Sequence, residues 1–236
     1  MLRSAKTILA SVIAAGATIG GMQSASAALQ EGDAAVMVGG SYIYMNETSY
    51  KFRPDGQAEY NTKVKLKKDK DPFTASLDFL IMATDDIAVN VGTSWPATVK
   101  RKLKDPVDGN AGKSQYKIMP FHVLGQYYFL PPQEELRPYV GFGLHYTHFS
   151  DFKSGSEKWD KVEFDKSYGV VGKLGLVFNI DEESFIDASA SWYYLEPDGK
   201  VKLKDPGGSA TGDIKGKLKD AKMNPWIFNV SFGFKI

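Results

Sequence analysis

Cysteine is absent from the 236-residue sequence, which excludes disulfide bridges, zinc–thiolate sites and cysteine nucleophiles. Long hydrophobic runs are also absent after residue 27, so no segment there has the length and apolarity of a transmembrane helix. The mean hydropathy of −0.28 would suit a water-soluble protein. A membrane barrel is exempt from that argument, because only every second residue of its strands faces lipid.

Net charge is almost absent as well, at +1. The 29 Lys and Arg residues are interleaved with 28 Asp and Glu residues, which does not suit nucleic-acid binding. We expect no metal site and no cofactor.

The first residues have the pattern of a secretory signal peptide. Arg3 and Lys6 precede a run of small apolar residues at 7–21, and Ala25-Ser26-Ala27 resembles a cleavage site. The run is too short and too rich in glycine for a membrane-spanning helix. We expect a cleaved signal at 1–27 and one domain at 28–236.

The rest of the sequence divides into about eight runs in which apolar and polar residues alternate, the pattern of half-buried strands. The clearest run is the last, at 226–236, where Ile227 is the one apolar residue on the polar face. The apolar face of this run contains Trp226, Phe228, Val230, Phe232, Phe234 and Ile236.

The connections between the runs alternate strictly in length. Short connections lie at 83–86, 130–136 and 179–184, and long ones near 46–73, 97–117, 150–166 and 195–222. An outer-membrane barrel has short periplasmic turns and long external loops. A soluble β-sandwich has no reason to sort its loops by length. The sequence therefore predicts an all-β fold, an eight-stranded antiparallel transmembrane barrel in the outer membrane of a Gram-negative cell.

Charge and aromatic residues are sorted along the same axis. The long loops are net basic, whereas the N-terminal end and the short turns are net acidic. Two belts of aromatic residues are expected where a barrel meets the two membrane interfaces. The belt at the long-loop end would contain Trp95, Tyr146, Tyr168, Trp192 and Trp226, and the other Tyr127, Phe129, Phe178, Phe185 and Phe234.

A lysine-rich motif, "VKLKDP" at 201–206, recurs with variations near 64–72, 99–106 and 217–220, always in a long loop. Its lysines alternate with Val or Leu, so strands should continue beyond the membrane as a rim. Such lysines can pair with lipopolysaccharide phosphates as point charges, or can simply keep an exposed strand edge soluble. The predicted rim lysines are Lys65, Lys67, Lys100, Lys102, Lys202, Lys204, Lys217 and Lys219.

The segment "RPYVGFGLHYTHF" at 137–149 resembles the fifth-strand signature of the outer-membrane protein W family. "MATDDIAV" at 82–89, "QYYF" at 126–129 and "NPWIFNVSFGFKI" at 224–236 fit other parts of that family in the expected order. The resemblance implies a narrow, largely apolar lumen and passive uptake of small hydrophobic molecules, with lateral release into the membrane. It also implies that the last strand is read by the barrel-assembly machinery, although Ile236 stands where an aromatic residue is usual.

An eight-stranded bore is only wide enough for side chains or one small ligand. Glycines of the fifth and sixth strands could leave a cavity or could only relieve strand curvature. A charge such as that of Lys173 must be paired or hydrated, and its predicted partners are two carboxylates of the same set. The predicted lumen residues are Asp78, Asn90, His122, Leu124, Gln126, Tyr128, Gly141, Gly143, His145, Lys173, Asp187, Ser189 and Asn229.

Three functions compete at this point. The first is a passive conduit for small apolar solutes, and the second is a structural or receptor barrel whose lysine rim binds lipopolysaccharide or an external partner. The third is an enzyme acting on lipid, since His148 and Ser150 have the His-x-Ser spacing of outer-membrane lipid A deacylases and Glu163 could orient them. Nothing in the sequence fixes Glu163 beside them, so we expect no enzymatic activity.

Overall fold

The computed structural model describes residues 29–54, 62–104, 112–154, 159–203, 214–219 and 221–236, and these contain fourteen strands. The predicted signal peptide at 1–27 and Lys204 lie outside the described residues. None of the described residues forms a helix that is long and apolar enough to span a membrane.

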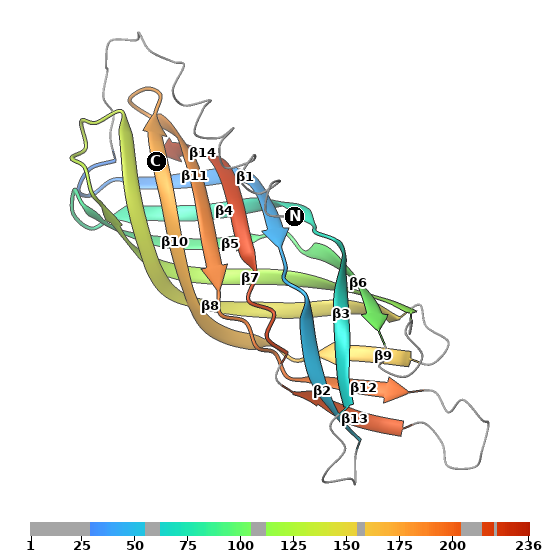
Figure 1. Ribbon diagram of the computed structural model, residues 1–236. Helices are drawn as coiled ribbons and strands as arrows, with labels where there is room; N and C mark the ends of the chain where they lie inside the picture. Colours follow the sequence, from blue (N-terminus) through green and yellow to red (C-terminus); the bar gives the residue numbers. More distant parts are fainter. Residues whose placement is uncertain (1–28, 55–61, 105–111, 155–158, 204–213, 220) are drawn as a thin grey trace.

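Eight of the strands form a closed antiparallel barrel (Figure 1). Each pairs with the next, in the order β1-β4-β5-β7-β8-β10-β11-β14, and β14 pairs back to β1. The strands are β1 (Ala34–Tyr44), β4 (Phe73–Met82), β5 (Ile87–Ser94), β7 (Gly112–Tyr128), β8 (Leu136–Ser154), β10 (Ser167–Asn179), β11 (Ser184–Tyr193) and β14 (Trp226–Lys235). The predicted eight-stranded barrel is confirmed, and its closure leaves no unpaired edge within the membrane.

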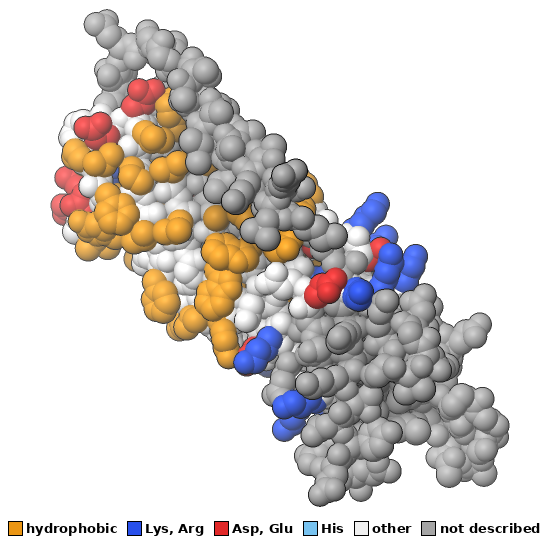
Figure 2. All heavy atoms as spheres, in the orientation of Figure 1, with side chains coloured by type: hydrophobic (Ala, Val, Ile, Leu, Met, Phe, Trp, Pro, Cys, Tyr) orange, Lys and Arg blue, Asp and Glu red, His pale blue; other side chains and the backbone are white. Residues whose placement is uncertain are grey.

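The alternation along each strand separates a lipid face from a lumen face. On β14, Val230, Phe232 and Phe234 are exposed outward, whereas Ile227 and Ser231 point into the bore and are buried. Figure 2 shows the outward hydrophobic side chains as a broad band around the barrel wall. In a bilayer this band would contact acyl chains, so its exposure to water in an isolated chain is not a packing defect.

A second group of strands extends the wall beyond the hydrophobic band, at the long-loop end (Figure 1). It contains β2 (Thr48–Pro54), β3 (Thr62–Lys70), β6 (Ala97–Lys104), β9 (Trp159–Phe164), β12 (Gly199–Leu203) and β13 (Ile214–Lys219). These pair in the order β7-β6-β3-β2-β13-β12-β9. We call this extension the outer tier. β7 and β8 run through both levels without a break, whereas the chain is interrupted between β3 and β4 and between β5 and β6.

Charge is polarised along the barrel axis, as the sequence predicts. In Figure 2, Lys and Arg side chains gather beside the outer tier and Asp and Glu side chains at the opposite end. At that acidic end the turns are closed by their own polar side chains. Asp181 Oδ1 accepts hydrogen bonds from the backbone amides of Glu183 and Ser184, at 3.0 and 2.8 Å. Hydrogen bonds from Ser184 and Glu183 hold the pKa of the Asp181 carboxyl below its ordinary value.

Candidate functional site

The lumen is divided into three layers along the barrel axis. An upper apolar layer lies toward the outer tier, a polar layer lies below it, and a lower apolar layer lies near the short turns. The upper apolar layer consists of Ile43, Met45, Ala97, Val99, Tyr116, Ile118, Leu124, Phe149, Phe164, Val171, Tyr193, Leu195, Ala221, Met223 and Ile227. Ile227 is therefore a member of this layer rather than an irregularity of the last strand.

Aromatic rings occupy the top of the upper apolar layer. Tyr116 lies at the centre of the group, with ring centroids 5.3 Å from Phe164, 6.1 Å from Phe149 and 6.4 Å from Phe152. Tyr116 and Phe149 come from β7 and β8, and Phe164 ends β9. Such ring contacts are weak individually. The Tyr116 hydroxyl also donates a hydrogen bond to Met223 Sδ at 4.0 Å.

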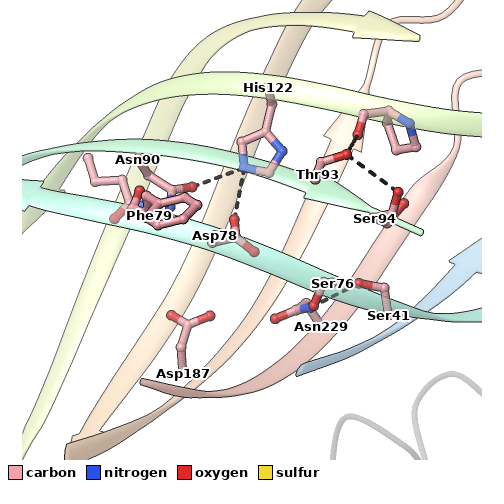
Figure 3. Close-up of polar contacts among 12 residues, drawn as sticks. Ser41, Ser76, Asp78, Phe79, Asn90, Thr93, Ser94, His122, Asp187 and Asn229 are labelled. Carbon is pink, nitrogen blue, oxygen red and sulfur yellow. Dashed lines mark hydrogen bonds and ion pairs between the residues drawn. The ribbon is translucent and has the colours of Figure 1, made fainter. Parts of the chain in front are cut away.

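The polar layer is organised around His122 (Figure 3). Its Nε2 lies 3.1 Å from Asp78 Oδ1 and 3.0 Å from Asn90 Oδ1, and its Nδ1 lies 3.0 Å from the Tyr193 hydroxyl. These partners place a donating Nε2–H toward the two side-chain oxygens, while the direction of the hydrogen bond between Nδ1 and the hydroxyl depends on the protonation of the ring. The four groups join β4, β5, β7 and β11 across the bore.

Gly92 makes the contact between His122 and Asp78 possible. Gly92 is paired with Asp78 on one side and with His122 on the other, so the two side chains meet over it. A Cβ atom at Gly92 would overlap the Asp78 carboxylate and lie 2.6 Å from the His122 ring. The sequence analysis missed this residue, although its place in an inward register between two polar strands was the available signal.

Replacing Gly92 with alanine is therefore expected to lower the free energy of unfolding by about 1–3 kcal/mol, the cost of forcing a methyl group into a filled site. Urea unfolding in phosphatidylcholine vesicles would measure the change. Gly172 is the matched control, because a Cβ there has no neighbour within 4 Å. Equal stability of the two alanine variants would contradict the role given to Gly92.

A second part of the polar layer surrounds Lys173 and Asp187. The Tyr139 hydroxyl donates to Asp187 Oδ2 at 2.6 Å, and the Lys173 ammonium lies 5.8 Å from the centroid of the same ring. Lys173 is 6% exposed and Asp187 only 2%. Asp187 Oδ1 is buried without a hydrogen-bond partner. Both predicted carboxylates, Asp78 and Asp187, thus lie in the layer that contains Lys173.

Asn229 completes the polar layer on the side of β14. Its amide nitrogen donates to the hydroxyls of Ser41 and Ser76 at 2.8 and 2.6 Å (Figure 3). The cavity between these residues, His122 and Lys173 has a volume of only about 30 Å³. That leaves room for only about two water molecules, so polar side chains occupy most of the bore at this level.

Arg137 forms the floor of the barrel beneath the lower apolar layer. This layer consists of Leu29, Ala35, Met37, Leu80, Met82, Ala88, Tyr128, Tyr139, Val177 and Phe185. The fully buried Arg137 guanidinium donates to the carbonyl oxygens of Leu130, Leu29 and Asp85 at 3.0, 2.7 and 2.6 Å. It also lies 4.6 Å from the centroid of the Tyr128 ring.

The other predicted lumen residues are distributed over these layers. Leu124 is in the upper apolar layer, Tyr128 in the lower one, and the Tyr128 hydroxyl donates to Gln126. His145 Nε2 lies 2.8 Å from the Tyr194 carbonyl oxygen and Nδ1 lies 3.1 Å from the Thr147 hydroxyl.

The glycines of β8 and β10 do not open a cavity. A Cβ at Gly143 would overlap the backbone of Val123, one at Gly175 would overlap the Tyr139 ring, and one at Gly141 would lie 3.3 Å from the Gln126 side chain. The expected gap in this wall is therefore occupied by neighbouring groups. Ser189, the remaining predicted lumen residue, lines the small cavity of the polar layer.

The predicted rim lysines lie on the outer tier wherever the structure describes them. Lys65 and Lys67 are on β3, Lys100 and Lys102 on β6, Lys202 on β12, and Lys217 and Lys219 on β13. The side chains of Lys100, Lys102, Lys217 and Lys219 are exposed. Lys102 forms an ion pair with Asp69 at 3.3 Å.

His148 and Ser150 both point outward from β8, away from the lumen, and Glu163 lies on β9. No cluster of three or more His, Asp or Glu side chains that could hold a metal ion is found in the part of the chain that the structure describes.

The regular strand pairing of the barrel wall is interrupted where β3 meets β4 and β5 meets β6. Paired registers stop at Lys70↔Lys100 and resume at Ser76↔Ser94. Between them the amide of Trp95 donates to the carbonyl of Ala75 at 2.8 Å, and prolines, which have no N–H, occupy positions 72 and 96. We call residues 71–75 and 95–99 the wall gap.

A groove of about 540 Å³ lies on the outer surface of the wall gap. Its lining consists of Lys70, Asp71, Pro72, Phe73, Pro96, Ala97, Thr98, Lys100 and Gln115. Ala97 also belongs to the upper apolar layer and is 2% exposed. Ala97 is therefore shared by the groove lining and the upper apolar layer.

Comparison with known proteins agrees with this architecture. The model of the OmpW family matches residues 30–236. Outer membrane protein W of Vibrio cholerae is 27% identical over 212 residues, which cover 87% of this chain and 89% of that protein. Outer membrane protein W of Salmonella typhi is 29% identical over 163 residues, which cover 67% of this chain and 71% of that protein.

Solved structures share the fold. The crystal structure of OprG from Pseudomonas aeruginosa has a TM-score of 0.72 at 22% identity and covers 89% of this chain and 98% of that one. The solid-state NMR structure of AlkL has a TM-score of 0.56 at 19% identity, with coverages of 92% and 95%. With a family match over almost all of residues 28–236 and relatives named as outer-membrane proteins, this chain is an outer-membrane β-barrel that belongs to the OmpW family.

Proposed function

We propose that this barrel passes small hydrophobic molecules passively from outside the cell into its upper apolar layer and releases them sideways, through the wall gap, into the membrane. The observation that carries the proposal is the position of Ala97, which belongs both to the upper apolar layer and to the groove on the outer wall. The apolar part of the groove lining, Phe73 and Pro96, would lower the cost of passage for an apolar solute at this point.

A straight path to the other end of the bore is unfavourable for such a solute. It would have to displace the hydrogen bonds of His122, Asp78 and Asn90 and then those of Arg137. Separating buried polar groups without replacing their partners costs about 1–3 kcal/mol for each group. The ring contacts above the polar layer are weak individually, and the hydrogen bond from Tyr116 to the Met223 sulfur is long, so they offer less resistance. The layered lumen therefore supports entry from the top and exit through the wall.

A bulky side chain at position 97 tests this path. Ala97→Phe is expected to slow the entry of a hydrophobic fluorescent tracer into reconstituted liposomes by about tenfold, a barrier increase of about 1.4 kcal/mol. The physical reason is that a phenyl ring would fill the wall gap. Ala190→Phe is the matched control, because Ala190 lies on the outward face of β11, away from the wall gap.

Wild-type liposomes that admit the tracer no faster than protein-free liposomes would refute passive passage itself. Equal tracer entry through wild type and Ala97→Phe would refute the lateral exit alone. A polar tracer of similar size should enter at the protein-free rate in every case, since the polar layer and the floor close the bore.

The last strand fits the proposed contact with the barrel-assembly machinery. β14 pairs with both β1 and β11, so closure depends on it, and Phe232 and Phe234 project outward with ring centroids 4.5 Å apart. This exposed aromatic pair, close to the C-terminal Ile236, offers a hydrophobic signal that is accessible before the barrel closes.

A further inference from the structure

The groove on the wall gap combines two uncompensated lysines with an apolar floor. Lys70 and Lys100 are paired directly across β3 and β6, and both line the groove. Two like charges opposite each other on neighbouring strands destabilise a sheet. Lys70 and Lys100 are both exposed, so their ammonium groups are available to a ligand outside the barrel.

The nearby acidic groups are engaged elsewhere. The Asp71 carboxylate accepts hydrogen bonds from the Tyr42 hydroxyl at 2.9 Å and from the Met45 amide at 3.4 Å. Asp69 forms its ion pair with Lys102 at 3.3 Å. Asp151 is paired with Lys117. Within the described part of the chain, Lys70 and Lys100 have no ion pair.

The level of the groove relative to the membrane identifies its partner. Directly below the two lysines, Phe73 is 74% exposed and Trp95 is 72% exposed. Exposed aromatic residues of this kind mark the membrane interface, where lipid phosphates lie. The groove therefore places two cations at the height of lipid phosphates and an exposed apolar surface, formed by Phe73 and Pro96, toward the acyl chains.

We propose that this groove is a binding site for a phosphate-bearing lipid of the outer leaflet, with lipid A, the membrane anchor of lipopolysaccharide, as the occupant. Lys70 and Lys100 bind its phosphate from two sides, and Gln115 and Thr98 provide neutral hydrogen-bonding groups. An acyl chain lies along Phe73. The volume of the groove, about 540 Å³, is within the range of small-molecule sites. This site does not depend on solute passage.

The test is lipid A binding to the full-length mature barrel in zwitterionic nanodiscs, measured by native mass spectrometry. The double variant Lys70→Ala/Lys100→Ala is expected to bind lipid A at least about tenfold more weakly, since one lysine near an anionic surface contributes about fivefold. Lys222→Ala is the matched control. Lys222 is also an exposed lysine just above the barrel strands, but Glu196 neutralises it at 3.3 Å. This control is expected to bind lipid A like the wild type.

Three results would overturn the proposal: unchanged lipid A binding by the double variant, equal binding of dephosphorylated lipid A to the wild type, or displacement of lipid A by millimolar inorganic phosphate. The last result would mean that the site takes a free ion rather than a lipid. Heat-dependent gel mobility confirms that each variant is folded. Tracer entry and lipid A binding of the wild type are separate measurements, so failure of the solute path and failure of the lipid site are separable.

Discussion

Replacing Arg137 with methionine is expected to lower the free energy of unfolding by about 3–5 kcal/mol. Methionine preserves much of the apolar volume but leaves the carbonyl oxygens of Leu29, Asp85 and Leu130 without their donor. Each buried acceptor that loses its partner costs about 1–3 kcal/mol. The total is below the simple sum, because carbonyls at the end of the barrel can regain water.

The loss also extends beyond local hydrogen bonds. Leu29 precedes the first barrel strand, Asp85 lies in the β4–β5 turn and Leu130 follows β7, so one guanidinium joins three separate connections at the floor. Arg137→Lys is expected to recover only part of the stability, because a single ammonium group has no planar fork to reach all three carbonyls.

Urea unfolding in phosphatidylcholine vesicles measures the Arg137 effect. Lys235→Met provides the control, since Lys235 forms a surface ion pair with Asp33 at 2.7 Å. Exposed pairs of this kind contribute at most about 1 kcal/mol. A change of less than about 1 kcal/mol for Arg137→Met would mean that the floor is held by strand pairing alone.

The barrel itself was predictable because its signals are local. Alternation assigns the faces of each strand, and short connections fix which strands are neighbours. Asp78 and Asp187 could be predicted as lumen residues from the alternation of inward and outward residues along their strands alone. The three layers could not be predicted in the same way. They depend on the register between strands, which places Ile227 in the apolar layer and Asn229, two residues later, in the polar one.

Arg137 and Gly92 show why some site residues escape sequence analysis. The partners of Arg137 are backbone carbonyls from three distant segments. Every residue has a backbone carbonyl, so the residue types in the sequence do not reveal which ones Arg137 contacts. Gly92 matters because it has no side chain. The need for that space can be recognised only once Asp78 and His122 are known to lie on either side of it. The glycines at 141 and 143 were more conspicuous in the sequence and could have left a cavity, but in the structure neighbouring groups pack closely against them.

Lys173 is the second residue whose loss should have a large effect. Lys173→Met keeps the length of the side chain and its packing on the Tyr139 ring, but removes the positive charge that attracts both Asp78 and Asp187. The two carboxylates are 5% and 2% exposed. Lys173 attracts these carboxylates without a direct ion pair, so its loss should cost less than a broken buried pair, for which the cost is about 3–5 kcal/mol. We expect a loss of about 1–3 kcal/mol in the free energy of unfolding.

A double-mutant cycle separates this electrostatic effect from simple loss of packing. Asp187→Asn removes one carboxylate and keeps the hydrogen bond from Tyr139 at that position. Combined with Lys173→Met, it is expected to restore about 1–2 kcal/mol relative to the single lysine variant, since coupling between neighbours commonly reaches that size. Strict additivity, within about 0.5 kcal/mol in urea unfolding, would show that Lys173 is not coupled to Asp187. A measured coupling would instead mean that charge balance between Lys173 and Asp187 contributes to the stability of the polar layer.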